Sequence, residues 1–144
     1  MKSSTEELVD AFLSRKLPQK EWTHEAHLKV GLWHLLHYDP NESLERLRQN
    51  IKQYNVACGI ENIDTQGYHE TITRFYVWLI NKFLQQTERS QPIDLLANRL
   101  ISLYGNKSFP LNYYSRDKSM SKTSRLQWVE PDLKPLVSVV FNID

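Results

Sequence analysis

Histidine is the residue type with the most potential for chemistry in this 144-residue sequence, and its five copies fall in two stretches. Four lie within residues 22–37, where His24 and His27 share a helix face, and His69 opens a later helical stretch. Imidazole nitrogens bind Zn, Fe, Mn and Ni, and three such ligands leave a coordination position open for water or substrate. The pattern therefore predicts a divalent-metal site at these three histidines, with Asp64 as the candidate fourth ligand.

The same histidines allow two interpretations without a metal. Two helix N-termini, with Thr23 and Arg74 nearby, suit a carboxylate or phosphate ligand. His27 or His69 is then a candidate general base, oriented by Glu25, Asp64 or Glu70, and Glu70 is itself a further catalytic candidate. Alternatively, the histidines are core residues that hydrogen-bond to tyrosine, carboxylate or backbone carbonyl groups and bind no ligand.

Spacing limits which histidines can act together. The HEAH sequence at residues 24–27 spaces its histidines at three, not at the four of the HExxH motif, which argues against a zinc protease. His34 follows His27 by seven residues, roughly 10 Å along a helix axis, which is too far for easy sharing of one metal ion. We therefore expect His34 to be structural.

Several helices must position these residues. Apolar residues at spacings of three and four, with only four glycines and six prolines, predict an all-α, single-domain helical bundle. We expect about five main helices, at residues 4–13, 24–37, 43–56, 68–86 and 93–105. The second is apolar nearly all round, which predicts a central buried helix, and Gly31 leaves room beside it for a neighbouring backbone or a ligand. If consecutive helices run up and down, the second and fourth are parallel, and His24, His27 and His69 meet at one end.

The helical pattern weakens after a core of about residues 4–105, so residues 106–144 are expected to form an irregular C-terminal extension. We expect two short helices there, then an extended stretch and a final VSVVF segment at residues 137–141. The fifth helix returns the chain to the histidine end, so residues 112–128 are expected to fold over that end as a lid or wall. The ligand-binding candidates that this arrangement brings together are Trp22, Thr23, Tyr68, Arg74, Tyr113, Tyr114 and Arg116.

Composition narrows the classes of partner. Lysine and arginine number 18 against 17 aspartates and glutamates, so nothing indicates a polyanion-binding face, and we expect no nucleic-acid partner. No uninterrupted apolar run reaches the roughly 20 residues that span a bilayer, so no membrane partner is expected. The single Cys58 and the absence of a signal-like start predict a cytoplasmic protein, for which a homo-oligomer is open.

Three segments carry a resemblance to known proteins: WTHEAHL at residues 22–28, GYHETITRFY at 67–76 and WVEPDLKPL at 128–136. Together they resemble a group of short, all-helical bacterial proteins without an assigned function. The resemblance implies the fold and no reaction. It directs attention to His24, His27, His69, Glu70 and Arg74, and to Trp128, Glu130 and Asp132 in the last segment.

Two function classes follow from these patterns. The first is a small helical protein whose histidine-lined polar site binds a metal ion or a small anionic ligand, with use as a small-molecule enzyme left open. The second is a non-enzymatic structural or protein-interaction module whose histidines serve core hydrogen bonding.

Overall fold

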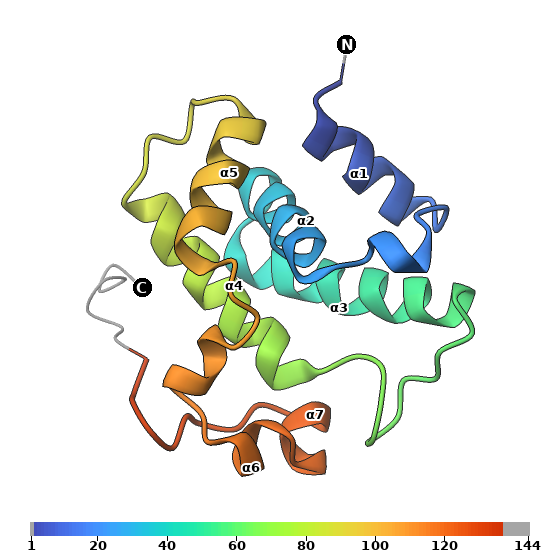
Figure 1. Cartoon of the computed structure of the whole chain (residues 1–144), viewed down its shortest axis with the longest axis vertical. Coiled ribbons are helices and arrows are strands. Elements are labelled where there is room, and N and C mark those ends of the chain that lie inside the picture. The colour runs from blue at the N-terminus through green and yellow to red at the C-terminus, as the bar shows by residue number, and fades with distance from the viewer. Residues whose placement is uncertain (1, 137–144) are drawn as a thin grey trace.

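The chain folds as a single all-α domain, as its sequence predicts (Figure 1). The computed structural model describes residues 2–136, and no strand forms within them, so the predicted VSVVF segment lies outside the described residues. Five longer helices make the core: α1 (Ser4–Leu13), α2 (His24–His37), α3 (Pro40–Ala57), α4 (Glu70–Gln85) and α5 (Ile93–Tyr104). Two shorter helices follow, α6 (Arg116–Ser119) and α7 (Lys122–Leu126), and short 3-10 turns form at Gln19–Glu21 and Phe109–Asn112.

Capping side chains explain where the helices begin. Ser3 and Glu6 form a reciprocal capping box at the start of α1. The Thr23 hydroxyl accepts a hydrogen bond from the Ala26 N–H at the start of α2. Helix α3 begins at Pro40, earlier than the predicted residue 43, because the Asp39 side chain caps it and proline suits the first helical position.

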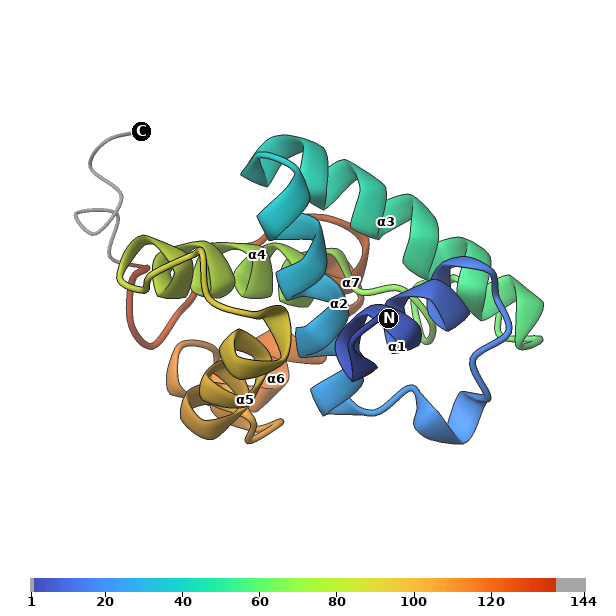
Figure 2. The ribbon, with the colours of Figure 1, turned by 90° about the horizontal axis from the view of Figure 1, so that it is seen from above.

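Helix α2 is the centre of the fold and contacts α1, α3, α4 and α5. Figure 2 shows that it crosses α4 instead of running alongside it, so the predicted parallel arrangement of these two helices is wrong. Gly31 lies at the close approach: a Cβ atom there would come within 2.8 Å of the Ile80 side chain. The crossing places the start of α2 opposite the middle turns of α4, away from the first residue of that helix.

The C-terminal extension packs against α4. Tyr113 and Tyr114 form a second apolar cluster with Phe75 and Leu79 of α4. Further on, the Thr71 hydroxyl donates to the Gln127 carbonyl. Residues 106–136 are therefore part of the same domain. Across the part of the chain that the structure describes, we find no helix with the length and apolar character needed to cross a membrane.

Candidate functional site

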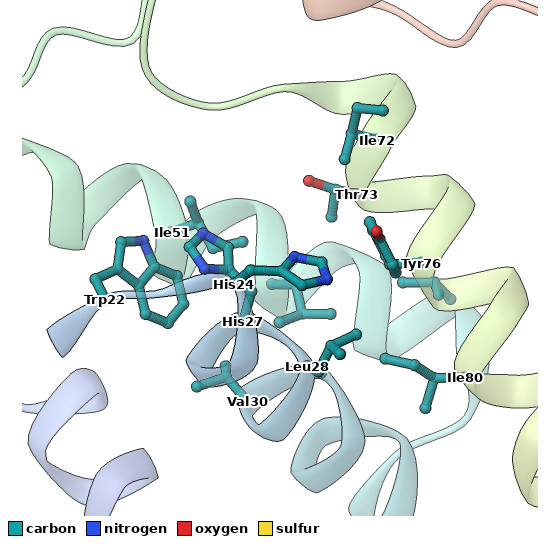
Figure 3. Close-up of a pocket in the computed structure, with 13 residues that line it drawn as sticks. Trp22, His24, His27, Leu28, Val30, Ile51, Ile72, Thr73, Tyr76 and Ile80 are labelled. Carbon is teal, nitrogen blue, oxygen red and sulfur yellow. The ribbon is translucent and has the colours of Figure 1, made fainter. Parts of the chain in front are cut away.

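A cavity of about 320 Å³ lies between α2, α3 and α4, beside Trp22 (Figure 3). We call it the histidine cavity, because His24 and His27 are among its lining residues. The other lining residues are mostly apolar or aromatic: Trp22, Leu28, Val30, Gly31, Leu47, Ile51, Ile72, Thr73, Tyr76, Val77 and Ile80. Of the described residues that line it, none is an aspartate, glutamate, lysine or arginine, so the cavity has no fixed charge.

His27 is held with one ring nitrogen available. Its ring stacks on Trp22 with the ring centres 3.7 Å apart. Its Nδ1–H donates to the Thr23 carbonyl at 2.6 Å, because a carbonyl can only accept, and this leaves Nε2 as an acceptor in the neutral ring. Nε2 has no hydrogen-bond partner within residues 2–136.

The protonation state of His27 follows from its surroundings. By its accessible surface His27 is an exposed residue, but neighbouring protein atoms, those of Trp22 among them, surround part of its imidazole ring. This enclosure lowers the pKa of His27 to about 4, although the hydrogen bond to Thr23 acts in the opposite direction. At neutral pH the imidazole is therefore uncharged.

His24 points toward α4, away from His27 and Trp22 (Figure 3). Its ring meets Tyr76 edge-on, with the ring centres 5.5 Å apart. Its Nε2–H lies 3.4 Å from the Tyr104 carbonyl, which is a long hydrogen bond. His24 is thus positioned by contacts with both α4 and α5.

Tyr76 adds a polar atom to the wall of the histidine cavity. Its hydroxyl is buried and has no hydrogen-bond partner among the described residues. Burial also raises the pKa of Tyr76, so the phenol keeps its proton at neutral pH. A buried hydroxyl without a partner costs free energy, and it is a donor for any acceptor placed beside it.

His69 has a different role from the predicted one. It is the N-cap of α4: its Nδ1 accepts from the Ile72 N–H at 3.2 Å, and its Nε2–H donates to the Ser119 carbonyl at 2.8 Å. Both ring nitrogens are therefore engaged: Nδ1 caps α4, and Nε2–H joins α4 to α6. Burial lowers the pKa of His69, which keeps the ring in this neutral tautomer.

The three predicted metal ligands do not converge in this structure. Among the residues that the coordinates place, no group of three histidine, cysteine, aspartate or glutamate side chains is arranged to hold a metal ion. Asp64, the candidate fourth ligand, lies 4.0 Å from the Lys122 ammonium group in α7. His34 is structural, as predicted, because it is fully buried, donates to the Val30 carbonyl and contacts the Asn50 amide.

A second cavity, of about 350 Å³, lies between α3, the start of α4 and α7. We call it the cationic cavity, because four of its lining residues are basic and one is acidic. The basic residues are Arg48, Lys52, Arg74 and Arg125, and the other lining residues are Asn62, Ile63, Tyr68, Glu70, Leu126, Gln127 and Trp128. Two of the predicted ligand-binding residues, Tyr68 and Arg74, lie here and not with His24 and His27.

Glu70 is held by an ion pair across the helices. Arg48 donates to its two carboxylate oxygens at 2.9 and 2.7 Å, and the Tyr68 hydroxyl donates at 2.8 Å. Burial raises the pKa of the Glu70 carboxyl, but these hydrogen bonds outweigh burial and hold the pKa below its usual value. Glu70 is thus ionised and fully engaged in structure, and it orients neither His27 nor His69.

The remaining predicted ligand-binding residues lie elsewhere. Tyr113 and Tyr114 are buried against Phe75, and Arg116 starts α6; none of the three borders either cavity as residues 2–136 define them. The predicted lid of residues 112–128 thus meets one of the three histidines, since the Ser119 carbonyl accepts from His69, but none of these residues lines the histidine cavity. The physical cause is packing along α4: Tyr113 and Tyr114 pack against Phe75, and the Gln127 carbonyl accepts from Thr71 one turn earlier on the same helix.

Thr23 contributes to the site indirectly, through its backbone carbonyl and its capping hydroxyl. The sequence patterns did not single out Tyr76, which shares its helix face with core residues. They also missed Arg48, whose partner Glu70 is 22 residues away.

Comparison with known proteins adds no identification: no family model, curated protein or solved structure matches this chain.

Proposed function

We propose that this protein binds a small, neutral, mostly apolar molecule in the histidine cavity. The observation that carries the proposal is the composition of that cavity: its walls are apolar and aromatic, with a few polar atoms and no fixed charge. Its volume of about 320 Å³ is at the lower end of the range for small-molecule sites, roughly 300–1,000 Å³.

Two polar groups set the orientation of such a ligand. The His27 Nε2 accepts a hydrogen bond from a ligand hydroxyl or N–H, because Nδ1–H is committed to Thr23. The Tyr76 hydroxyl is buried in the wall, and a small shift of its ring toward the ligand lets it donate to a ligand oxygen or nitrogen and gain the partner it otherwise lacks. Trp22, stacked on His27, supplies an aromatic surface. A phenol or an indole has the chemistry that fits.

Binding is favoured over acid–base catalysis by the pKa of His27. A general base works best with a pKa near the operating pH, and a pKa of about 4 makes His27 a weak base at neutral pH. We therefore propose a binding role for His27. The single, unpaired Cys58 suits the cytoplasmic location that is part of this proposal.

A divalent metal is the second candidate ligand of the histidine cavity. It is favoured by one observation: the hydrogen bond from His27 Nδ1–H to a backbone carbonyl is the arrangement that orients many metal-binding histidines. His24 also lines the cavity, but its ring is turned toward Tyr76, so exogenous ligands would complete the coordination at His27. Bound metal in protein purified without a histidine tag, measured by mass spectrometry, tests this candidate.

The proposal is tested by an NMR titration of the isotope-labelled protein with phenol and with indole. We expect saturable shifts at Gly31, Thr73 and Tyr76, and at the His27 ring. Ile51→Trp places a larger side chain in the cavity wall and should abolish these shifts, whereas Leu103→Trp adds the same ring on the exposed side of α5 and should preserve them. No saturable shift in the wild type, or equal binding by the two variants, would contradict the proposal.

The alternative function is a non-enzymatic module that recognises a protein or a second copy of this chain. It makes a distinct prediction, because an interaction surface does not depend on an internal cavity. Under this alternative, Ile51→Trp leaves the oligomeric state measured by light scattering unchanged, and phenol and indole bind neither variant.

A further inference from the structure

We propose that the cationic cavity is a second binding site, and that its ligand is a small molecule carrying a phosphate group. This inference is independent of the proposed function, because no residue lines both cavities. It begins with the charge of the lining: four basic side chains against one acidic side chain leave a net charge of +3 around about 350 Å³.

The one carboxylate of the cavity is already neutralised. Glu70 accepts two hydrogen bonds from Arg48 and one from Tyr68, so its negative charge is already balanced by a structural ion pair. Lys52, Arg74 and Arg125 are then left as the cations that face the cavity. None of these three makes an ion pair within the described part of the chain.

The contacts of these cations fix the side chains without neutralising them. The Arg125 guanidinium donates to the Gly67 carbonyl at 2.8 Å. The Arg74 guanidinium lies 4.9 Å from the centre of the Trp128 ring, and the Lys52 ammonium lies 5.2 Å from that of Tyr68. Carbonyl and ring contacts satisfy part of the hydrogen-bonding capacity of each cation and leave its charge uncompensated.

The surroundings of Arg125 show that the burial of its charge costs free energy. It is half-buried, and burial lowers the pKa of its guanidinium, which means that the surroundings disfavour its charge. A buried charge is stable when an opposite charge and good hydrogen bonds accompany it. An oxyanion in the cavity supplies both to Arg125.

The cavity selects among anions by charge and size. Three uncompensated cations favour a phosphate group, which carries between one and two negative charges near neutral pH, over a single carboxylate. The cavity has room beyond the phosphate itself, and Trp128 and Tyr68 give it aromatic walls. The class of ligand that fits is a phosphate monoester with a small, flat organic part.

The experiment is a titration of the full chain with inorganic phosphate, acetate and phenyl phosphate at constant ionic strength, followed by NMR at the Trp128 indole N–H. That N–H donates to Glu130 at 2.7 Å and lies on a ring that borders the cavity, so its signal reports on the site. We expect saturable binding of phosphate, tighter binding of phenyl phosphate and at least about tenfold weaker binding of acetate.

Variants test the assignment of residues. Arg74→Gln should weaken phosphate binding about tenfold or more and Arg74→Lys less, and the fold should stay in place because Arg74 is an exposed residue that packs on the Trp128 ring and makes no ion pair within residues 2–136. Arg99→Gln removes an exposed cation of α5 and should change nothing. Ile51→Trp should also bind phenyl phosphate normally, which excludes the histidine cavity as its site. The proposal is overturned if phosphate does not saturate, if acetate binds as tightly, or if Arg74→Gln and Arg99→Gln behave alike.

Discussion

The two cavities share helices α3 and α4 but differ in chemistry. On each of these helices, residues that are adjacent in sequence line different cavities. Leu47 and Ile51 of α3 line the histidine cavity, while their neighbours Arg48 and Lys52 line the cationic cavity. On α4, Thr73 and the adjacent Arg74 are divided in the same way. One residue turns a helix by about 100°, so one helix can present an apolar face to one cavity and a charged face to another.

This comparison shows why the histidines and the cations are not one site. Before the helices are placed, His69, Glu70 and Arg74 are close in sequence and suggest a common function. The crossing of α2 over α4 leaves His24 and His27 beside Tyr76, and it leaves Glu70 and Arg74 facing α3 and α7. The region around α4 is therefore divided in two. We call the residues that line the histidine cavity the neutral half, and those that line the cationic cavity the charged half.

The substitution with the largest expected effect is Glu70→Gln, which removes the ion pair between Glu70 and Arg48 in the cationic cavity. We expect the free energy of unfolding to fall by about 2 kcal/mol or more, because Arg48 loses two charge-assisted hydrogen bonds to a carboxylate with 10 % side-chain exposure and keeps its pair with Glu45, whose side chain is 56 % exposed. Urea unfolding measures the change. The control is Glu42→Gln, which removes an exposed pair with Arg46 and should cost about 0.5 kcal/mol or less. Equal losses in the two variants would show that the Arg48–Glu70 pair stabilises the protein no more than an exposed ion pair does.

His69→Ala tests whether this histidine belongs to the structural connection between α4 and α6. We expect a loss of about 2 kcal/mol, since the helix cap and the bond to Ser119 are both removed. Hydrogen exchange in residues 116–126 should increase. His69→Asn keeps an acceptor for the cap and should recover part of the loss, and a fully stable His69→Ala protein would contradict the assignment.

The stability of the protein should depend on pH through three histidines, one of which, His27, lines the histidine cavity. The pKa of His27 falls from 6.5 in the unfolded chain to about 4, and burial also lowers the pKa values of His34 and His69. The unfolded chain therefore binds more protons between pH 6.5 and pH 4, so stability must fall as pH falls through this window.

The same window gives a measurable contribution for one residue. After a discount for the solvent-accessible surface of His27, we expect its share to be about 1 kcal/mol between pH 7 and pH 5. His27→Gln should remove that share from the slope of unfolding free energy against pH. His37→Gln, at an exposed position stacked on Trp33, is the control. An unchanged slope in His27→Gln would mean that its pKa is not lowered.

Tyr76→Phe gives the smallest expected effect and has an unusual sign. Removal of a buried hydroxyl without a partner should stabilise the free protein by about 1 kcal/mol while weakening phenol binding. Tyr114→Phe removes a hydroxyl that donates to the Val129 carbonyl at 2.7 Å, so it should instead destabilise by about 1 kcal/mol. Destabilisation by both variants would show that the Tyr76 hydroxyl has a partner in solution.

Local sequence signals predicted the helices well where the cap and the apolar pattern agree. Helix α1 has its predicted bounds, and α2 begins after Thr23 and ends at His37 as expected. Helix α4 begins two residues later than predicted, because His69 serves as its cap, a role for which Ser, Thr, Asp and Asn are the usual residues.

The site was less predictable because it depends on helix crossing. Sequence identified His24, His27 and Trp22, which do share a cavity. It could not place Tyr76 or Ile51 beside them, since periodicity gives the face of a helix but not the angle at which helices cross. Glu70 stands four residues before Arg74, a spacing that favours an ion pair within the helix, whereas the observed partner is Arg48, which is reached through tertiary packing.

The most direct test of the account is one pair of NMR titrations on the same labelled sample, with phenol and then with inorganic phosphate. We expect two separate sets of shifted signals: His24, His27, Thr73 and Tyr76 with phenol, and Arg74, Arg125 and Trp128 with phosphate. We also expect that saturation with one ligand leaves the affinity for the other unchanged. Shifts of the same residues by both ligands, or competition between them, would contradict the division of this protein into a neutral and a charged site.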